Sequence, residues 1–328
     1  MITEVNTISD IKQVSDEIEK EVSKYVVGWE GVTRSLIIAL LTGGHVLIEG
    51  VPGTAKTYLA KVFSDSLSLE FKRIQSTPDL MPADITGSRI FNPKTLEFDF
   101  MPGPIFANIV LVDEINRAPP KTQSALLEAM QESQCTVDGN TMNLEEPFMI
   151  LATKNPIEFA GTYPLPPAQL DRFMSRLIMN YPVKEAWVEV LRRKNARGEA
   201  ISVEPIVKKE AVLSAQRIVK LEVKVGDDVL EYVADLVRST RTLQNVILGG
   251  SPTASISLLK ASKGYAAVVG GRDRVTKDDV RAVAFDVLNH RLLLREVTLD
   301  ATKEEDASDY GMSQIRNTLA QSIAIVKS

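Results

Sequence analysis

A glycine-rich segment of eight residues, Gly50 to Thr57, constrains the fold of this chain more than any other feature. It follows an apolar run, His45 to Glu49, that predicts a buried strand, and it precedes a stretch that predicts a helix. A strand, a glycine-rich turn and a helix in this order direct several backbone N–H groups toward one point, where a phosphate can bind. The sequence therefore predicts a phosphate-binding loop in an α/β fold.

Two side chains of the loop can contact a bound nucleotide and its metal ion. Lys56 can reach the β- and γ-phosphates of a nucleotide, and the Thr57 hydroxyl can bind Mg²⁺. Ala55 departs from the usual pattern, which has its last glycine at this place. We expect the nucleotide phosphates to be held by Gly50, Pro52, Gly53, Thr54, Ala55, Lys56, Thr57 and Tyr58.

A second apolar run, Ile109 to Val112, ends in two adjacent carboxylates, Asp113 and Glu114. Such a run suits a parallel strand covered on both faces, and ligands of such sheets bind at the carboxyl ends of the strands. Successive side chains on a strand point in opposite directions, so the two carboxylates can differ in role. We expect Asp113 to hold Mg²⁺, directly or through water, and Glu114 to polarise an attacking water. The alternative is an acidic strand end at the surface without a catalytic role.

The composition narrows the class of protein. The chain has 328 residues, 25% of them charged and 44% hydrophobic, which is enough for two ordinary domains. The net charge of −5 disfavours a general nucleic-acid coat. No apolar stretch approaches the ~20 residues of a membrane span, and no signal peptide is evident. A single cysteine, Cys135, fits a reducing cytoplasm, and only two histidines, His45 and His290, argue against a structural zinc site.

The sequence pattern changes near residue 183. Residues 1–183 alternate helical and buried-strand patterns, which predicts an α/β domain with a parallel sheet. Two projecting hairpins are expected within it, at 88–100 and 135–143, because turn-forming residues separate short strand patterns there. Residues 184–294 predict an all-helical lid domain, and residues 295–328 a helical extension of unknown role. The lid helices are expected at 184–197, 207–219, 226–242, 252–270 and 276–293.

These residues together resemble the MoxR-type AAA+ ATPases over roughly residues 20–293. The resemblance is carried by ordered words along the chain and not by the glycine-rich loop alone. The words are Val26-Val27-Gly28, the loop at 50–57, QSTPDLMPADITG at 75–87, PGPIFAN at 102–108, DEINRAPPKTQ at 113–123, ATKNP at 152–156, GTYPLP at 161–166 and AQLDRF at 168–173. The resemblance implies an AAA+ core with a parallel sheet, followed by an all-helical lid.

The resemblance also implies roles for residues outside the loop. Asn155 matches sensor 1, which orients water near the γ-phosphate, and the alternative is a plain turn residue. Arg172 matches the arginine finger, which acts on the nucleotide of a neighbouring subunit. The alternatives are an ion pair between Arg172 and Asp171 within one subunit, and Arg176 as the finger.

The residues expected to contact the adenine base have a less distinctive sequence. Val27 and Gly28 match the adenine pocket, but an ordinary turn could have the same sequence. Trp29 stands where the family usually has glutamine. We expect Trp29 to be a core or interface aromatic, with stacking on adenine as the alternative.

Polar residues around the acidic strand end have two possible roles each. Arg117 could reach a neighbour's phosphate, although stabilisation of its own loop is favoured. Gln75 could restrain Glu114 when no partner is bound. Thr253 stands where the family usually has the sensor 2 arginine. Either another lid cation, Arg238 or Arg241, replaces it, or hydrolysis is slower and less tightly coupled to lid closure.

The resemblance implies an ATP- and Mg²⁺-dependent remodeller or maturation chaperone that acts as a homo-oligomeric ring, with six subunits expected. Its client would be a protein, in some cases with a partner that contains a von Willebrand factor A domain. One alternative is a nucleotide-gated assembly switch with very weak hydrolysis. Another is a nucleic-acid motor, which the acidic chain and the few cations in the two hairpins disfavour.

Overall fold

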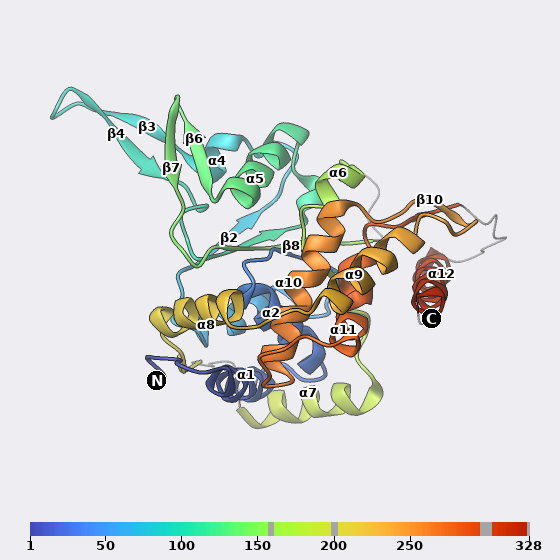
Figure 1. The fold of residues 1–328 in the computed structure, drawn as a ribbon. Coiled ribbons are helices and arrows are strands. Elements are labelled where there is room, and N and C mark those ends of the chain that lie inside the picture. The colour runs from blue at the N-terminus through green and yellow to red at the C-terminus, as the bar shows by residue number, and fades with distance from the viewer. Residues whose placement is uncertain (157–160, 198–202, 296–303, 327–328) are drawn as a thin grey trace.

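Five parallel strands form the central sheet of the protein (Figure 1). The computed structural model describes residues 1–156, 161–197, 203–295 and 304–326. The strands are β1 (Val46–Glu49), β2 (Phe71–Gln75), β5 (Ile109–Asp113), β8 (Met149–Lys154) and β9 (Ser175–Ile178), in the order β2-β5-β8-β1-β9. The sheet and the helical region after it confirm the predicted fold class.

Successive residues of the central strands pack on opposite faces of the sheet, as the pleat requires. On one face, Val46 and Ile48 join a core with α2 (Glu30–Leu41) and α3 (Lys56–Asp65). On the other face, Leu47 joins a second core with α5 (Pro120–Glu132). The apolar runs in the sequence are continuous because both faces are covered.

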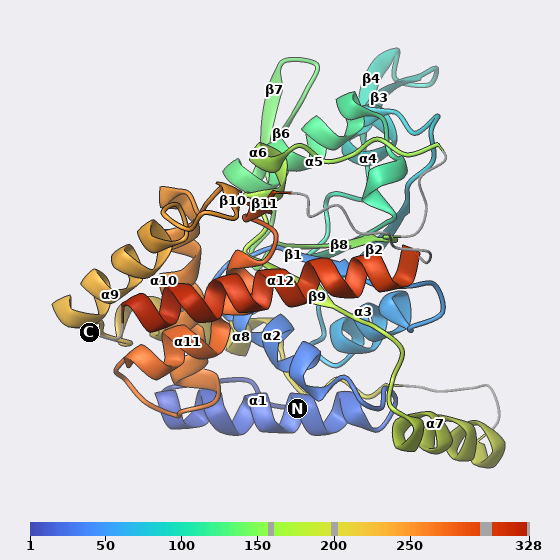
Figure 2. The ribbon, with the colours of Figure 1, turned by 90° about the vertical axis from the view of Figure 1, so that its right-hand side faces the viewer.

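The helices after residue 183, apart from the first, extend the first of these two cores. They are α7 (Lys184–Arg197), α8 (Lys209–Leu221), α9 (Asp227–Ser239), α10 (Pro252–Val268), α11 (Lys277–Leu288) and α12 (Glu304–Ile325). Helices α8 to α11 share apolar contacts with α1 (Ile8–Ser23) and α2. Figure 2 shows α7 standing apart from α9, α10 and α11. A short antiparallel pair, β10 (Val246–Leu248) and β11 (Leu293–Leu294), closes the far end of this region.

Two hairpins extend from the side of the molecule that carries α4 (Pro82–Thr86) and α5 (Figures 1 and 2). The first consists of β3 (Gly87–Asn92) and β4 (Glu97–Pro102), and the second of β6 (Gln134–Val137) and β7 (Asn140–Asn143). Both agree with the expected hairpins at 88–100 and 135–143. Gly87 is required at the base of the first, because a Cβ there would lie 2.1 Å from the carbonyl oxygen of Met101. The remaining short helices are η1 (Ile115–Arg117) and α6 (Pro167–Leu170).

Candidate nucleotide-binding site

The glycine-rich loop joins the carboxyl end of β1 to the first turn of α3. Gly50 fits closely against β9, because a Cβ at this place would lie 2.2 Å from the carbonyl oxygen of Met179. Gly53 has a φ of +82°, which an L side chain rarely adopts. Ala55 has a φ of 66° and a ψ of 25°, so it holds the left-handed conformation that glycine would adopt without strain. The loop thus has the geometry of the glycine pattern even where the sequence departs from it.

Thr57 and Asp113 meet beneath this loop. The Thr57 hydroxyl lies 3.2 Å from each carboxylate oxygen of Asp113. Thr153, from β8, donates a hydrogen bond of 3.1 Å to the same carboxylate, which is buried. Hydroxyl and carboxylate oxygens are the ligands that Mg²⁺ prefers, so Thr57 and Asp113 fit a magnesium ion. Arg73, from β2, also approaches, and its Nε lies 2.7 Å from Asp113 Oδ2.

Lys56 extends its ammonium group along the inner side of the loop. It donates to the carbonyl oxygens of Gly50 and Lys154, the latter at 3.5 Å. Asn155 follows Lys154 at the carboxyl end of β8 and is buried. The structure therefore brings Lys56, Asp113 and Asn155 to the carboxyl edge of the sheet, as the sequence predicts.

Glu114 leaves the strand with a φ of 54°, a left-handed conformation that is rare for a non-glycine residue. Its backbone N–H donates to the Thr153 hydroxyl at 2.9 Å, which holds this conformation in place. Its carboxylate accepts from Nη1 of Arg117 at 3.1 Å. The Gln75 side chain accepts from Arg73 at 2.8 Å, so the partner of Glu114 is Arg117 and not the expected Gln75.

A cavity of about 720 Å³ opens beside the loop. Its volume is within the range of small-molecule sites. The loop contributes one wall, and aromatic and aliphatic side chains contribute most of the rest. The lining includes Tyr25, Val26, Val27, Trp29, Pro52, Gly53, Thr54, Ala55, Tyr58, Tyr181, Pro182, Trp187, Val190 and Arg193. Gly28 adjoins this lining with a φ of 84°, so Val27, Gly28 and Trp29 lie where a base contact is expected.

The wall opposite the loop was not expected from the sequence. Tyr181 and Trp187 stack with their ring centroids 6.1 Å apart and an interplanar angle of 11°. Trp187 lies on α7, and α7 is the only described helix after residue 183 that lines the cavity. Of the other lid helices, α8 and α10 pack against α1 and α2. Two exposed aromatics at the start of α7 were the sequence signal that could have located this wall.

Arg172 lies at the opposite edge of the sheet from the phosphate loop. It precedes β9, whose first residue Ser175 pairs with Val46 at the start of β1. The loop follows the end of β1, one strand length away. Because all five strands are parallel, these are the amino and carboxyl edges of one sheet. Arg172 therefore lies at the edge of the sheet away from the Lys56 of its own subunit, as a residue serving a neighbour would.

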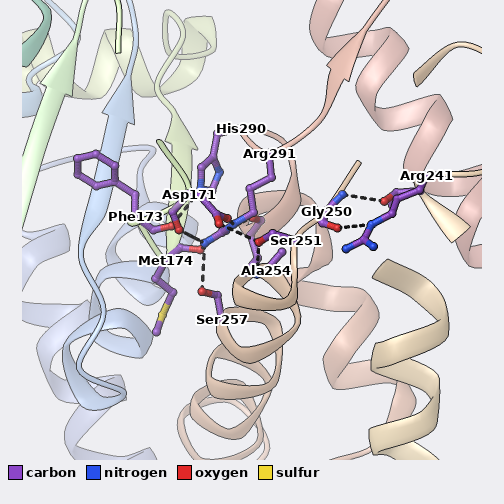
Figure 3. Close-up of polar contacts among 12 residues, drawn as sticks. Asp171, Phe173, Met174, Arg241, Gly250, Ser251, Ala254, Ser257, His290 and Arg291 are labelled. Carbon is purple, nitrogen blue, oxygen red and sulfur yellow. Dashed lines mark hydrogen bonds and ion pairs between the residues drawn. The ribbon is translucent and has the colours of Figure 1, made fainter. Parts of the chain in front are cut away.

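Two sets of contacts disfavour the alternatives that the sequence left open for Arg172. Asp171 pairs with Arg291, at 2.7 Å from Nε to Oδ1, and not with Arg172 (Figure 3). Arg176 is held within the subunit by Asn289, at 2.7 Å, and by Glu49, at 3.4 Å. Burial lowers the pKa of the Arg176 guanidinium, and the Glu49 carboxylate opposes that shift. Within the described part of the chain, the Arg172 guanidinium is partly exposed and has no ion-pair partner.

Thr253 lies at the same amino edge as Arg172. It is exposed in the first turn of α10, and Ser251, which caps this helix, donates to Asp171 at 2.8 Å. Arg241 bonds the Gly250 carbonyl oxygen at 2.8 Å in the same corner (Figure 3). Neither Arg238 nor Arg241 lines the cavity. The two cations considered as replacements for a sensor 2 arginine therefore do not lie at the cavity of their own subunit.

Comparison with known proteins gives the family. Residues 45–175 match the ATPase family associated with various cellular activities (AAA), and residues 238–309 match the AAA lid domain. The chain is 39% identical over 314 residues to Chaperone MoxR1 of Mycobacterium tuberculosis, which covers 92% of this chain and 80% of the relative. The chain belongs to the MoxR family of AAA+ ATPases. It is also 45% identical over 285 residues to the uncharacterized protein YeaC of Bacillus subtilis, covering 87% of this chain and 88% of YeaC.

A solved structure supports the same assignment. The crystal structure of a putative ATPase from Cytophaga hutchinsonii superposes with a TM-score of 0.83 at 38% identity and covers 96% of both chains. None of the helices within the described ranges is long and apolar enough to cross a bilayer.

Proposed function

We propose that this MoxR-family protein binds and hydrolyses ATP with Mg²⁺ and uses the energy to remodel or mature a protein client. The observation that carries the proposal is the meeting of the Thr57 hydroxyl with both oxygens of Asp113, at 3.2 Å, under the loop that carries Lys56. The phosphate-binding backbone, a cation and a metal-ligand pair converge there. The adjoining cavity has room for the nucleoside and aromatic side chains suited to a base.

Each side chain has a distinct task in this proposal. The loop backbone and Lys56 hold the phosphates, and Thr57 and Asp113 hold the metal ion. Mg²⁺, when bound, neutralises charge on the phosphates. Glu114 orients and polarises the water, and Asn155 fixes its position next to the terminal phosphate. Arg73 must release Asp113 or share it with the metal ion, because its guanidinium lies where a cation is attracted.

The site is complete only when a second copy of the chain is present. Arg172 lies at the amino edge of the sheet, so it can meet the loop of a neighbour but not its own. A head-to-tail contact of this kind repeats around a closed ring. We propose a homo-oligomeric ring of six subunits, in which a guanidinium from one subunit stabilises charge on the terminal phosphate of the next.

The hairpin of β3 and β4 supports a protein client. Ile90, Phe91, Leu96 and Phe98 are exposed on it, and Phe91 and Phe98 contact each other edge to face. An exposed apolar surface of this kind suits contact with another protein. Its two cations, Arg89 and Lys94, are matched by Glu97 and Asp99, which does not suit a nucleic-acid backbone. We further propose that a protein with a von Willebrand factor A domain is a partner of this chain. We also propose that the chain is located in the cytoplasm.

Phosphate release measured over a series of protein concentrations tests this function. We expect turnover to rise with assembly, measured in parallel by the mass of the complex. Glu114→Gln should bind Mg-ATP and lose hydrolysis. Arg172→Ala should bind ATP nearly normally and lose about 10³-fold or more in turnover. Turnover that is independent of concentration and survives Arg172→Ala contradicts the trans site.

The contact between Arg117 and Glu114 favours a second candidate, a nucleotide-gated assembly switch with very weak hydrolysis. The ion pair of 3.1 Å holds the proposed base away from a water. In that case assembly follows nucleotide binding, while phosphate release by the wild type stays at the level of Glu114→Gln. The same two measurements therefore separate the candidates.

A further inference from the structure

Arg291 is the most completely enclosed cation whose role the proposed function leaves unexplained. Its side chain is 2% exposed, and it lies just beyond the carboxyl end of α11. A buried ion pair is weak evidence for stability, because desolvation of the two charges offsets their attraction. The reason for placing a guanidinium here has to be found in what it contacts.

The contacts of Arg291 converge on the segment that carries Arg172 (Figure 3). Its Nη2 donates to the carbonyl oxygens of Asp171, at 3.0 Å, and Phe173, at 2.7 Å. Its Nη1 donates to the carbonyl oxygen of Met174 at 3.0 Å. Its Nε donates to the Asp171 carboxylate at 2.7 Å. One guanidinium thus bonds the backbone on both sides of Arg172.

The backbone N–H groups of residues 171–174 donate to α6 and to His45, which leaves their carbonyl oxygens in need of donors. These residues form a turn between α6 and β9, outside helix and strand. Buried backbone carbonyls need donors, and a guanidinium offers five N–H groups in a fixed planar fork. Lysine offers one compact point charge and cannot reproduce that fork. The conformation of the turn therefore depends on the shape of the Arg291 side chain.

Two more residues of the lid region contact the same turn. His290 bonds the carbonyl oxygen of Phe173 through its ring Nε2 at 3.0 Å. Ser251, at the start of α10, donates to the second carboxylate oxygen of Asp171 at 2.8 Å. Residues at the start of α10 and just after α11 therefore both form hydrogen bonds with this turn. A displacement of these helices would therefore also change the position of Arg172.

We propose that Arg291 is a positioning residue that sets the Arg172 guanidinium for the nucleotide of the neighbouring subunit and couples lid position to hydrolysis there. This rests on the proposed function, since it needs Arg172 to act in trans. Arg291 itself touches no nucleotide. Its loss should therefore harm the site of the next subunit and leave the cavity of its own subunit intact.

Arg291→Lys in the full chain tests the proposal. We expect kcat to fall about 10- to 100-fold, because small misplacements of a catalytic group have effects of this size. The KM for ATP and the binding of a fluorescent ADP analogue should stay unchanged. Ser251→Ala, which removes the bond to Asp171 and the cap bond from the Ala254 N–H, should give a smaller loss of the same kind, so the test does not depend on Arg291→Lys alone. The matched control is Arg272→Lys, at another arginine–aspartate pair of the lid region, with Asp279 at 2.7 Å.

Mixing subunits separates positioning from a general structural defect. Arg291→Lys retains Glu114, and Glu114→Gln retains a correctly held Arg172, so each supplies what the other lacks. A one-to-one mixture should recover about a quarter of wild-type activity, because random assembly pairs intact halves at that frequency. Arg172→Ala mixed with Glu114→Gln is the positive control. Recovery there but not with Arg291→Lys overturns this inference alone, whereas failure of the control overturns the trans site itself.

Discussion

At the scale of single residues, strained backbone marks the two ends of the proposed site. Ala55 and Glu114 both hold left-handed conformations without being glycine, with φ of 66° and 54°. Such strain persists only where the surroundings fix it, and it gathers at functional sites. Ala55 starts the helix whose first turn faces the phosphates, and Glu114 turns the chain directly after Asp113.

Ala55→Gly should stabilise the loop. Glycine adopts this conformation without the Cβ clash that costs an L residue roughly 1–2 kcal/mol, while its greater freedom in the unfolded chain takes back part of the gain. We expect a net increase in the free energy of unfolding of about 0.5–1 kcal/mol, measured by urea denaturation without nucleotide. Gly31→Ala, at the start of α2, is a control for the effect on stability of exchanging glycine and alanine elsewhere in the chain. Destabilisation by Ala55→Gly contradicts the strain argument.

Arg117→Ala should raise turnover modestly. The pair with Glu114 is partly exposed, and such pairs contribute about 0.2–1 kcal/mol, which corresponds to a ~1.5- to 5-fold increase in kcat on release. Arg117→Lys, which keeps a cation, should remain close to wild type. Steady-state phosphate release on the assembled protein measures both. A tenfold or larger fall with Arg117→Ala would assign Arg117 to the phosphate of the neighbour instead.

At the scale of elements, the sequence predicts what depends on local pattern. Helix α7 at 184–197 has the predicted bounds, and β5 begins at the predicted residue 109 and ends at Asp113, because apolar period and turn residues define them. The contact between Thr57 and Asp113 follows from the rule that parallel strands present their carboxyl ends at one edge. The pairing of Asp171 with Arg291 does not, because 120 residues separate the partners and neither has a distinctive local pattern.

The position of α7 could not be predicted for the same reason. The sequence identifies a helix, but not that its first turn stacks Trp187 on Tyr181 against the cavity. Nor does the sequence show that α8 and α10 lie on α1 and α2. Helix propensity and amphipathic period predict which face of a helix is buried, but they do not predict which other element that face packs against.

Trp187→Ala should weaken nucleotide binding through this element. Loss of an aromatic stack on a base costs about 1–3 kcal/mol, so we expect the Kd for ADP to rise roughly 10-fold with little change in kcat. The chain has two tryptophans, Trp29 and Trp187, and both line the cavity, so intrinsic fluorescence reports binding directly. Leu191→Ala, at an exposed residue of α7 outside the cavity lining, is the matched control. An unchanged Kd would remove α7 from the base site.

At the scale of the whole molecule, the two edges of the sheet have different tasks. The carboxyl edge carries the loop, the proposed metal ligands Thr57 and Asp113, and the cavity. The amino edge carries Arg172 and the corner where the lid region meets β9. His45 also lies at the amino edge, just before β1, where its Nε2 bonds the carbonyl oxygen of Met130 and its Nδ1 accepts from the Ile150 N–H, both at 3.0 Å.

Because both contacts of His45 use the neutral ring, the folded protein should lose stability in mild acid. Burial lowers the pKa of His45 from 6.5 to about 4, and burial also lowers that of His290. The unfolded chain therefore binds protons that the folded chain does not, and the stability present above pH 6.5 is lost as the pH falls toward 4. For His45 alone the loss approaches about 3 kcal/mol, at 1.36 kcal/mol for each pKa unit. Denaturant titrations between pH 7.5 and 4.5 should show this slope in the wild type and a shallower one in His45→Gln, whose amide keeps a donor and an acceptor. Equal slopes in the two proteins would mean that His45 does not couple protonation to unfolding.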